Sequence, residues 1–189
     1  NNHKDTSKIQ VSNHLAKAVQ TGQLIFHAKD LANIWGITKA NTLHTTLKRY
    51  QAQGLLQRLH KGMYSLMPAD TLPDELIGIK TLHGYCYVST ETILARAGLW
   101  QQILPAITLI GQKSRRIPVA GREFVCRRLA DKYLYNTAGL DYVNGILTAS
   151  VERAVADLLY YNPKAHIDGA DRIDWTAVKS MQKAVGYLN

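Results

Sequence analysis

Side chains that can form hydrogen bonds or ion pairs with a polyanion are concentrated between residues 38 and 61. They are Thr38, Lys39, Asn41, Thr42, Thr45, Lys48, Arg49, Arg58, His60 and Lys61. Hydroxyl and amide groups can meet the edges of nucleobases, whereas Lys and Arg can neutralise phosphates. No acidic residue lies between Asp30 and Asp70 to repel a polyanion. These residue types favour contact with nucleic acid, provided that the fold places them on one surface.

Two short helices joined by a tight turn would bring most of these side chains together. The apolar spacing predicts a helix over residues 28–35, ended by Gly36, and a second helix from an N-cap at Thr38 to about Gln53. At about 100° per residue, the inward face of the second helix collects Ala40, Leu43, Leu47 and Tyr50. The opposite face is then polar and basic.

The outward face of the second helix has the mixture of groups that suits a DNA groove. Because a recognition helix inserts its N-terminal half, we expect Asn41, Thr42 and Thr45 to contact bases. Lys48 and Arg49 would reach the phosphate backbone. The alternative interpretation is the solvated face of an ordinary helix.

A two-stranded wing is predicted directly after the second helix. Residues 55–59 and 63–66 have the apolar content of short strands, and His60, Lys61 and Gly62 join them. Arg58, His60 and Lys61 would then lie at the tip, where a wing meets DNA. With a helix over residues 7–21 and a strand near 24–26, the segment reads as a winged helix-turn-helix that binds double-stranded DNA.

The charge and the proline content divide the 189-residue chain in two. Residues 1–68 hold nine Lys and Arg against two acidic residues, or +7, while residues 69–189 hold fourteen against twelve, or +2. Pro68 and Pro73 interrupt the apolar pattern. We therefore expect a DNA-binding domain over residues 1–68 and an effector domain over residues 69–189.

The second domain has a mixed α/β pattern, which makes the whole chain α+β. Helices are predicted over 74–82, from a Ser89 cap to 97, from a Ser150 cap to 162, and over 175–187. Strands are predicted over 85–88, 106–110, 117–129 with a turn at Gly121, 133–135 and 146–148.

A second group of basic residues lies in the predicted strand 117–129 of this domain and in the segment just before it. It comprises Lys113, Arg115, Arg116, Arg122, Arg127 and Arg128. One interpretation is a second surface that contacts an anion, either flanking DNA or another nucleic acid. The other is a charged hairpin on one face of the sheet.

The sequence offers no convincing catalytic site, metal site or cofactor site. Glu123, Asp131 and Lys132 could suggest a nuclease, but neighbouring residues 131 and 132 would point to opposite faces of a strand. Cys86 and Cys126 are interpreted as small core residues. The acidic residues of 168–174 lack the glycine and closing Glu of a calcium-binding loop. We therefore expect a non-enzymatic protein without cofactor or metal.

Three stretches resemble the AbiEi antitoxins of type IV abortive-infection toxin–antitoxin systems. DLANIWGITKANTLHTTLKRYQAQGLLQRLHKGMYSL is similar to their N-terminal winged helix-turn-helix, and YVSTETILARAGL and TASVERAVADLLY are similar to their antitoxin domain. The resemblance implies a repressor that binds inverted repeats in its own operator. It also implies an antitoxin that counters a nucleotidyltransferase-like toxin without a stable complex.

Two other functions compete with this expectation. The first is a winged-helix regulator whose second domain binds a small-molecule effector or dimerises; the second is a DNA-modifying enzyme targeted by the winged helix.

The longest apolar runs are too short to cross a bilayer, and no secretion signal opens the sequence. We expect a cytoplasmic protein with no membrane partner.

Overall fold

The chain folds into two units that divide after Pro73. The computed structural model describes the backbone of residues 2–188 and the side chains of residues 8–188. The division lies five residues beyond the predicted boundary and within the proline-containing segment. A single 3₁₀ turn, η1 (Ala69–Thr71), occupies this segment. The protein is α+β, as the sequence predicts.

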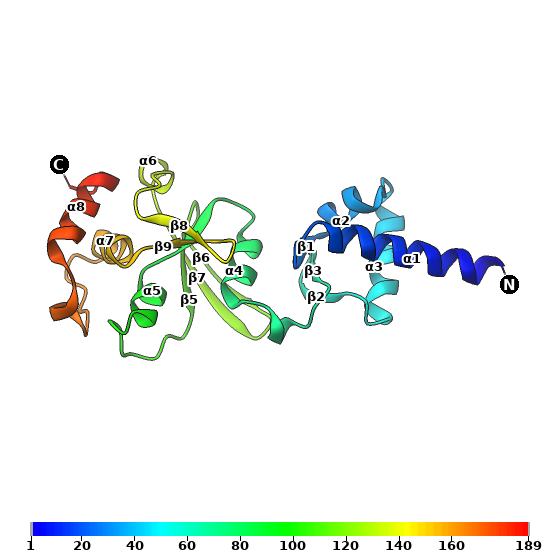
Figure 1. Ribbon diagram of the computed structural model, residues 1–189, viewed down its shortest axis with the longest axis horizontal. Coiled ribbons are helices and arrows are strands. Elements are labelled where there is room, and N and C mark those ends of the chain that lie inside the picture. The colour runs from blue at the N-terminus through cyan, green and yellow to red at the C-terminus, as the bar shows by residue number, and fades with distance from the viewer. Residues whose placement is uncertain (1, 189) are drawn as a thin grey trace. The chain divides into compact units, whose positions relative to one another are not determined.

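The first unit combines helices with a three-stranded sheet (Figure 1). Its elements are α1 (Asn2–Gln20), β1 (Ile25–His27), α2 (Ala28–Trp35), α3 (Ala40–Ala52), β2 (Gln57–His60) and β3 (Met63–Ser65). The strands are antiparallel in the order β1-β3-β2. This is the arrangement of a winged helix-turn-helix, with α2 and α3 as the two helices and β2 and β3 as the wing.

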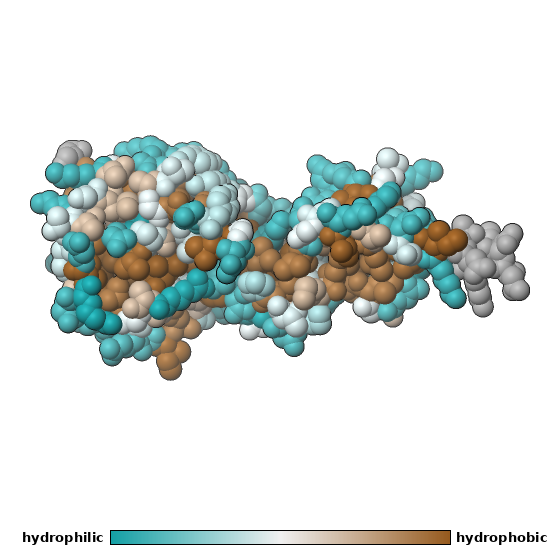
Figure 2. All heavy atoms as spheres, in the orientation of Figure 1, coloured by the Kyte–Doolittle hydropathy of each residue, from teal (hydrophilic) through white to brown (hydrophobic). Residues whose placement is uncertain are grey.

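An apolar core holds these elements together. Phe26, Leu31, Trp35, Leu47 and Tyr50 are buried and pack in one cluster, so β1, α2 and α3 share a single core. On the face drawn in Figure 2, apolar residues (brown) in both units lie between areas of hydrophilic residues (teal). Within residues 2–188, no helix has the length and apolar character needed to cross a membrane.

The second unit is built on a six-stranded sheet in the order β6-β7-β5-β4-β9-β8 (Figure 1). Its strands are β4 (Cys86–Val88), β5 (Ile107–Gly111), β6 (Arg115–Val119), β7 (Arg122–Arg128), β8 (Leu140–Val143) and β9 (Ile146–Ala149). Two pairs, β5 with β7 and β4 with β9, are parallel, and the other pairs are antiparallel. The sheet is therefore mixed.

Helices cover both faces of this sheet. The helices of this unit are α4 (Asp74–Leu82), α5 (Glu91–Arg96), α6 (Asp131–Leu134), α7 (Val151–Tyr161) and α8 (Trp175–Val185), with a 3₁₀ turn η2 (Ala170–Arg172) before α8, and α8 packs against α7. Helix α4 lies against the face that carries Phe124, because a Cβ added at Gly78 would meet that ring. Helix α5 lies on the other face, where the Thr92 and Thr108 hydroxyls are 2.9 Å apart.

A buried ion pair within α7 makes hydrogen bonds to the second face of the sheet. The side chains of Arg153 and Asp157 are 0% exposed, and Nε of Arg153 donates to Oδ1 of Asp157 over 2.9 Å. Arg153 also donates to the carbonyl oxygens of Asn136 and Ala138 and to the Tyr87 hydroxyl. The Asp157 carboxylate in turn accepts from the hydroxyls of Tyr87, Ser89 and Tyr187, so each charged group has several partners, which offsets the cost of removing it from water.

The predicted cap of α5 is wrong, whereas that of α7 is confirmed. Thr90, not Ser89, is the N-cap of α5, and it takes the positive φ of 54° that a β-branched residue rarely adopts. The Ser89 hydroxyl donates instead to Asp157, over 2.8 Å, and so belongs to the buried network. Ser150 accepts a hydrogen bond from the backbone N–H of Arg153 and caps α7 as expected.

Two further predictions fail near the edge of the sheet. Residues 133–135 are not a strand, because the one-turn helix α6 covers Asp131–Leu134. The strand β8 was not predicted, and it pairs with β9 through a turn at Asn144 and Gly145, both with positive φ. An Asn-Gly pair favours this hairpin turn.

Candidate nucleic-acid interface

Hydrogen bonds fix both ends of α2, and the bond at its end shapes the turn into α3. The backbone N–H of His27 donates to the Asp30 carboxylate over 3.0 Å at its start. Gly36 ends the helix with φ +69°, and the backbone N–H of Ile37 donates to the Ala32 carbonyl over 2.9 Å. The geometry of a helix-turn-helix therefore follows from the caps and from a glycine in the left-handed region.

Helix α3 begins one residue later than predicted. Its N-cap is Lys39, whose side chain makes no capping hydrogen bond, so the prediction of a Thr38 cap is wrong. Thr38 lies exposed before the helix. Ala40 is also exposed, which corrects its assignment to the core, because it lines the open hollow between α3 and the wing.

The inward face of α3 packs through an aromatic cluster. Tyr50 is 0% exposed, and its hydroxyl lies 2.8 Å from Nδ1 of His14 on α1. The His14 ring stacks on Trp35 with centroids 4.9 Å apart, and the Trp35 indole donates to the His14 carbonyl. This cluster fixes the rotation of α3 about its axis and therefore decides which residues face outward.

The predicted contact residues lie on the outward face of α3. Lys39, Asn41, Thr42, Thr45 and Lys48 are exposed. Arg49 is half-buried, with its guanidinium carbon 5.3 Å from the centre of the Tyr50 ring. The face is thus open within the first unit.

Two hollows border this face, and each adds a residue that the sequence did not indicate. One lies between α1 and α3 and is lined by Gln10, Asn41, Thr42, Thr45, Thr46 and Arg49. Nε of Arg49 is buried without a hydrogen-bond partner among the described residues. The other lies between α3 and the wing and includes His44. The i,i+3 spacing from Asn41 could have revealed His44, but nothing in the sequence places Gln10 against α3.

The wing carries its cations at the tip, as predicted. Arg58, His60 and Lys61 are exposed, and Gly62 supplies a φ of +72° in the turn. Nε of Arg58 donates to the His60 carbonyl over 3.4 Å. Lys61 and Arg58 also line the hollow beside α3, so the wing presents positive charge to a groove whose other side is formed by Asn41 and His44 of the helix.

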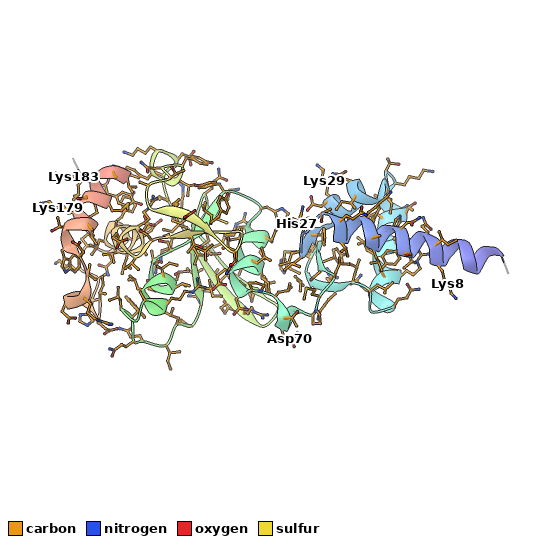
Figure 3. The ribbon with its side chains drawn as sticks, in the orientation of Figure 1. Lys8, His27, Lys29, Asp70, Lys179 and Lys183 are labelled. Carbon is orange, nitrogen blue, oxygen red and sulfur yellow. The ribbon has the colours of Figure 1, made fainter. Side chains whose placement is uncertain are left out.

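Other basic side chains add to the charge of the first unit. Figure 3 shows Lys8 on α1 and Lys29 on α2 extending outward. Both are exposed.

The second group of basic residues does not form one surface. Arg115 pairs in register with Cys126 and Arg116 with Val125, so these two adjacent arginines lie on opposite faces of the sheet. Arg122 forms an ion pair with Asp74 on the α4 face. This division corrects the expectation that all six basic residues share a contact surface.

Arg127 also forms an ion pair within the second unit and is therefore not free to bind another anion. Its guanidinium makes two hydrogen bonds, of 2.9 and 2.6 Å, to the Glu91 carboxylate on the face that α5 covers. Burial alone would raise the pKa of Glu91, but the hydrogen bonds from Arg127 hold it below its usual value. Lys113 and Arg128 are exposed.

The structure brings together no catalytic constellation from the rejected candidates. Asp131 lies in the helix α6, not on a strand, and Glu123 lies 4.0 Å from Arg116. Burial raises the pKa of Cys86 to about 12 and that of Cys126 to about 11, so both thiols are uncharged at neutral pH. No group of three or more His, Cys, Asp or Glu that could hold a metal occurs among the described residues.

Comparisons with known proteins identify a fold. The two units define an α+β protein with a winged helix-turn-helix before a mixed sheet. The RV2827C protein from Mycobacterium tuberculosis has a similar crystal structure, with a TM-score of 0.56 and 14% sequence identity over 94% of this chain and 78% of that one. No family model and no curated protein sequence matches the chain. At this identity the likeness establishes the fold alone.

Proposed function

We propose that the chain is a sequence-specific DNA-binding repressor that acts as the antitoxin of a type IV toxin–antitoxin system. The observation that carries the DNA-binding part is the exposed outward face of α3, which lies beside a cationic wing. Asn41, Thr42 and Thr45 would enter the major groove, and the wing would contact the adjacent backbone. Two copies would occupy an inverted repeat.

The DNA-binding proposal is tested by the salt dependence of affinity. The intact protein is titrated by fluorescence anisotropy against duplexes from the region upstream of its own gene and against an unrelated duplex. We expect tighter binding to the upstream DNA and a salt slope that corresponds to roughly five to eight neutralised phosphates. Equal affinity for both duplexes, or affinity that salt leaves unchanged, would contradict a sequence-specific repressor.

The antitoxin part rests on the resemblance of both halves to AbiEi antitoxins. The partner would be a nucleotidyltransferase-like toxin encoded beside this gene, and neutralisation would not need a stable complex. Growth is measured while the neighbouring gene is expressed with and without this protein. Restored growth without co-purification supports the proposal, whereas toxicity that persists in the presence of the folded protein rejects it.

The alternative of an effector-binding or dimerising regulator differs in one observable. An effector would change the affinity of the intact protein for its operator, and the neighbouring gene would not need to encode a toxin. The same anisotropy titration, repeated with candidate small molecules, therefore distinguishes the two functions.

A further inference from the structure

A hollow of about 350 Å³ lies at one edge of the sheet in the second unit. The carboxyl ends of the parallel strands β5 and β7 meet there, at Gly111 and Arg128. Residues 82–86, 111–113, Arg115 and Cys126 line it. In open α/β sheets this edge is where ligands bind, and the volume is within the range of small-molecule sites.

The lining of this hollow is cationic and contains no acidic residue. Lys113 and Arg115 supply the positive charge, and His83 also lines the hollow. Neither Lys113 nor Arg115 forms an ion pair with any side chain among residues 8–188, whereas Arg122 and Arg127 of the next strand both do. Two cations beside one cavity therefore keep their charge available for an anion from solution.

Glycines and neutral thiols leave room for that anion. A Cβ at Gly111 would lie 3.0 Å from Sγ of Cys126 and 3.3 Å from Cβ of Cys86, so a side chain there would occupy the floor. A Cβ at Gly84 would lie 3.2 Å from Oε1 of Gln112. Because burial keeps both thiols protonated, they do not oppose a negative ligand.

An aromatic pair borders the same hollow. Tyr85 lines it and packs against Tyr135 with ring centroids 5.1 Å apart. Nε2 of Gln112, another lining residue, donates to the Tyr135 hydroxyl over 2.7 Å, which holds that ring in place. Tyrosine faces are sequence-tolerant platforms for nucleobases.

We propose that this hollow binds a nucleoside monophosphate, either free or as the 5′-terminal nucleotide of a single strand. The phosphate lies against Lys113 and Arg115, and the base packs against Tyr85. An inorganic phosphate alone would leave the aromatic side of the cavity unused. The proposal concerns only the second unit and does not depend on DNA binding by α3.

The test is isothermal titration of the intact protein with AMP, UMP, inorganic phosphate, adenosine and a single-stranded RNA hexamer with and without a 5′ phosphate. We expect AMP or UMP to bind at least about tenfold more tightly than phosphate or adenosine, a difference that both halves of the ligand must supply. Tighter binding of the 5′-phosphorylated hexamer than of AMP would identify a strand end as the ligand, and the reverse order a free nucleotide.

Adjacent arginines provide a matched control. Arg115→Ala should weaken nucleotide binding about tenfold, whereas Arg116→Ala, which removes the same charge from the opposite face, should leave it unchanged. Tyr85→Leu should weaken binding of AMP but not of phosphate. Thermal melts establish that each variant is folded.

Three results would overturn the assignment. They are the absence of nucleotide binding at millimolar concentration, equal affinity for AMP and inorganic phosphate, and equal losses from Arg115→Ala and Arg116→Ala. The Asn41→Ala variant should bind nucleotide normally, so a failure of the proposed DNA contacts would remain separable from a failure here.

Discussion

Arg115 and Arg116 are identical neighbours in the sequence, yet β6 directs them to opposite faces of its sheet. Residue type alone predicted their charge but not their surroundings. Once a strand is assigned, the period-two alternation separates them, so the predicted single surface was wrong for a reason that the sequence already contained. The proximity of Lys113 to His83 could not be derived from strand alternation in this way, because it depends on which strands become neighbours.

Asn41 and Lys48 offer the sharpest test of the helix-turn-helix at the level of single residues. Asn41→Ala should reduce the preference for operator over random duplex, at a cost of about 1–3 kcal/mol on the operator only, because an amide reads base edges. Lys48→Ala should weaken both duplexes alike, because the proposed contact of Lys48 is to phosphate, which every sequence offers. Competition anisotropy with the two duplexes measures both effects. If Asn41→Ala reduces the affinity for operator and random DNA equally, Asn41 does not contact bases.

His14 should make the first unit sensitive to acid. Burial, with the nearby charges of Lys17 and Arg49, lowers the pKa of His14 below 6.5. The unfolded chain therefore binds the proton more readily, and stability should fall as the pH drops below about 6.5. Urea titrations of the intact protein between neutral and mildly acidic pH measure how the free energy of unfolding changes with pH. Hydrogen exchange in α1 and α3 reports the unfolding of the first unit.

The matched variants are His14→Gln and His60→Gln. His14→Gln should flatten the pH dependence, since an amide can still bond to the Tyr50 hydroxyl but does not titrate. His60 lies exposed on the wing, and its replacement should preserve the slope. An unchanged slope in His14→Gln would assign the acid sensitivity to another group.

At the level of elements, caps decided which predictions were accurate. Helices α2 and α4 have the bounds that their sequences indicate, because Gly36 ends the first and Pro73 precedes the second. The Thr38 and Ser89 caps were wrong because a neighbouring residue took the cap position, and Ser89 had a partner distant in sequence. Strand β8 has only four residues and lies at an edge of the sheet, so it is too short to show an alternating apolar pattern in the sequence.

This difference between caps can be measured. Ser150→Ala should lower the free energy of unfolding by about 1 kcal/mol, because it removes the acceptor for the backbone N–H of Arg153. Thr38→Ala should leave that free energy nearly unchanged, since Lys39 occupies the cap position of α3. Chemical denaturation of both variants gives the comparison. Equal destabilisation by the two changes would mean that Thr38 caps α3 in solution.

At the level of the whole molecule, each unit has a core of its own, and the second depends on one buried network. Arg153→Met should destabilise this unit by about 3–5 kcal/mol, because Asp157 would lose its buried countercharge. Operator affinity, which the first unit would supply, should be retained at temperatures where the variant is folded. Calorimetry and anisotropy on the same sample measure both properties. Loss of operator binding in the folded variant would show that the second unit takes part in DNA recognition.

The fold as a whole was more accessible from sequence than the sites. Apolar periodicity and glycine positions indicated the winged helix-turn-helix and the mixed second unit. The hollow at Lys113 and Arg115 could not be predicted, because it requires β7 to pair with β5 while β6, which lies between them in the chain, takes the edge of the sheet.

The position of β8 at the end of the larger sheet has a practical consequence. Within residues 2–188 this strand has a partner on one side only, and Tyr142 and Val143 are 70% and 53% exposed. An edge strand with exposed apolar side chains can pair with a strand of another molecule, so aggregation in concentrated preparations would begin there. The substitution Val143→Lys would place a positive charge on this edge, and repulsion between two such edges would oppose their association.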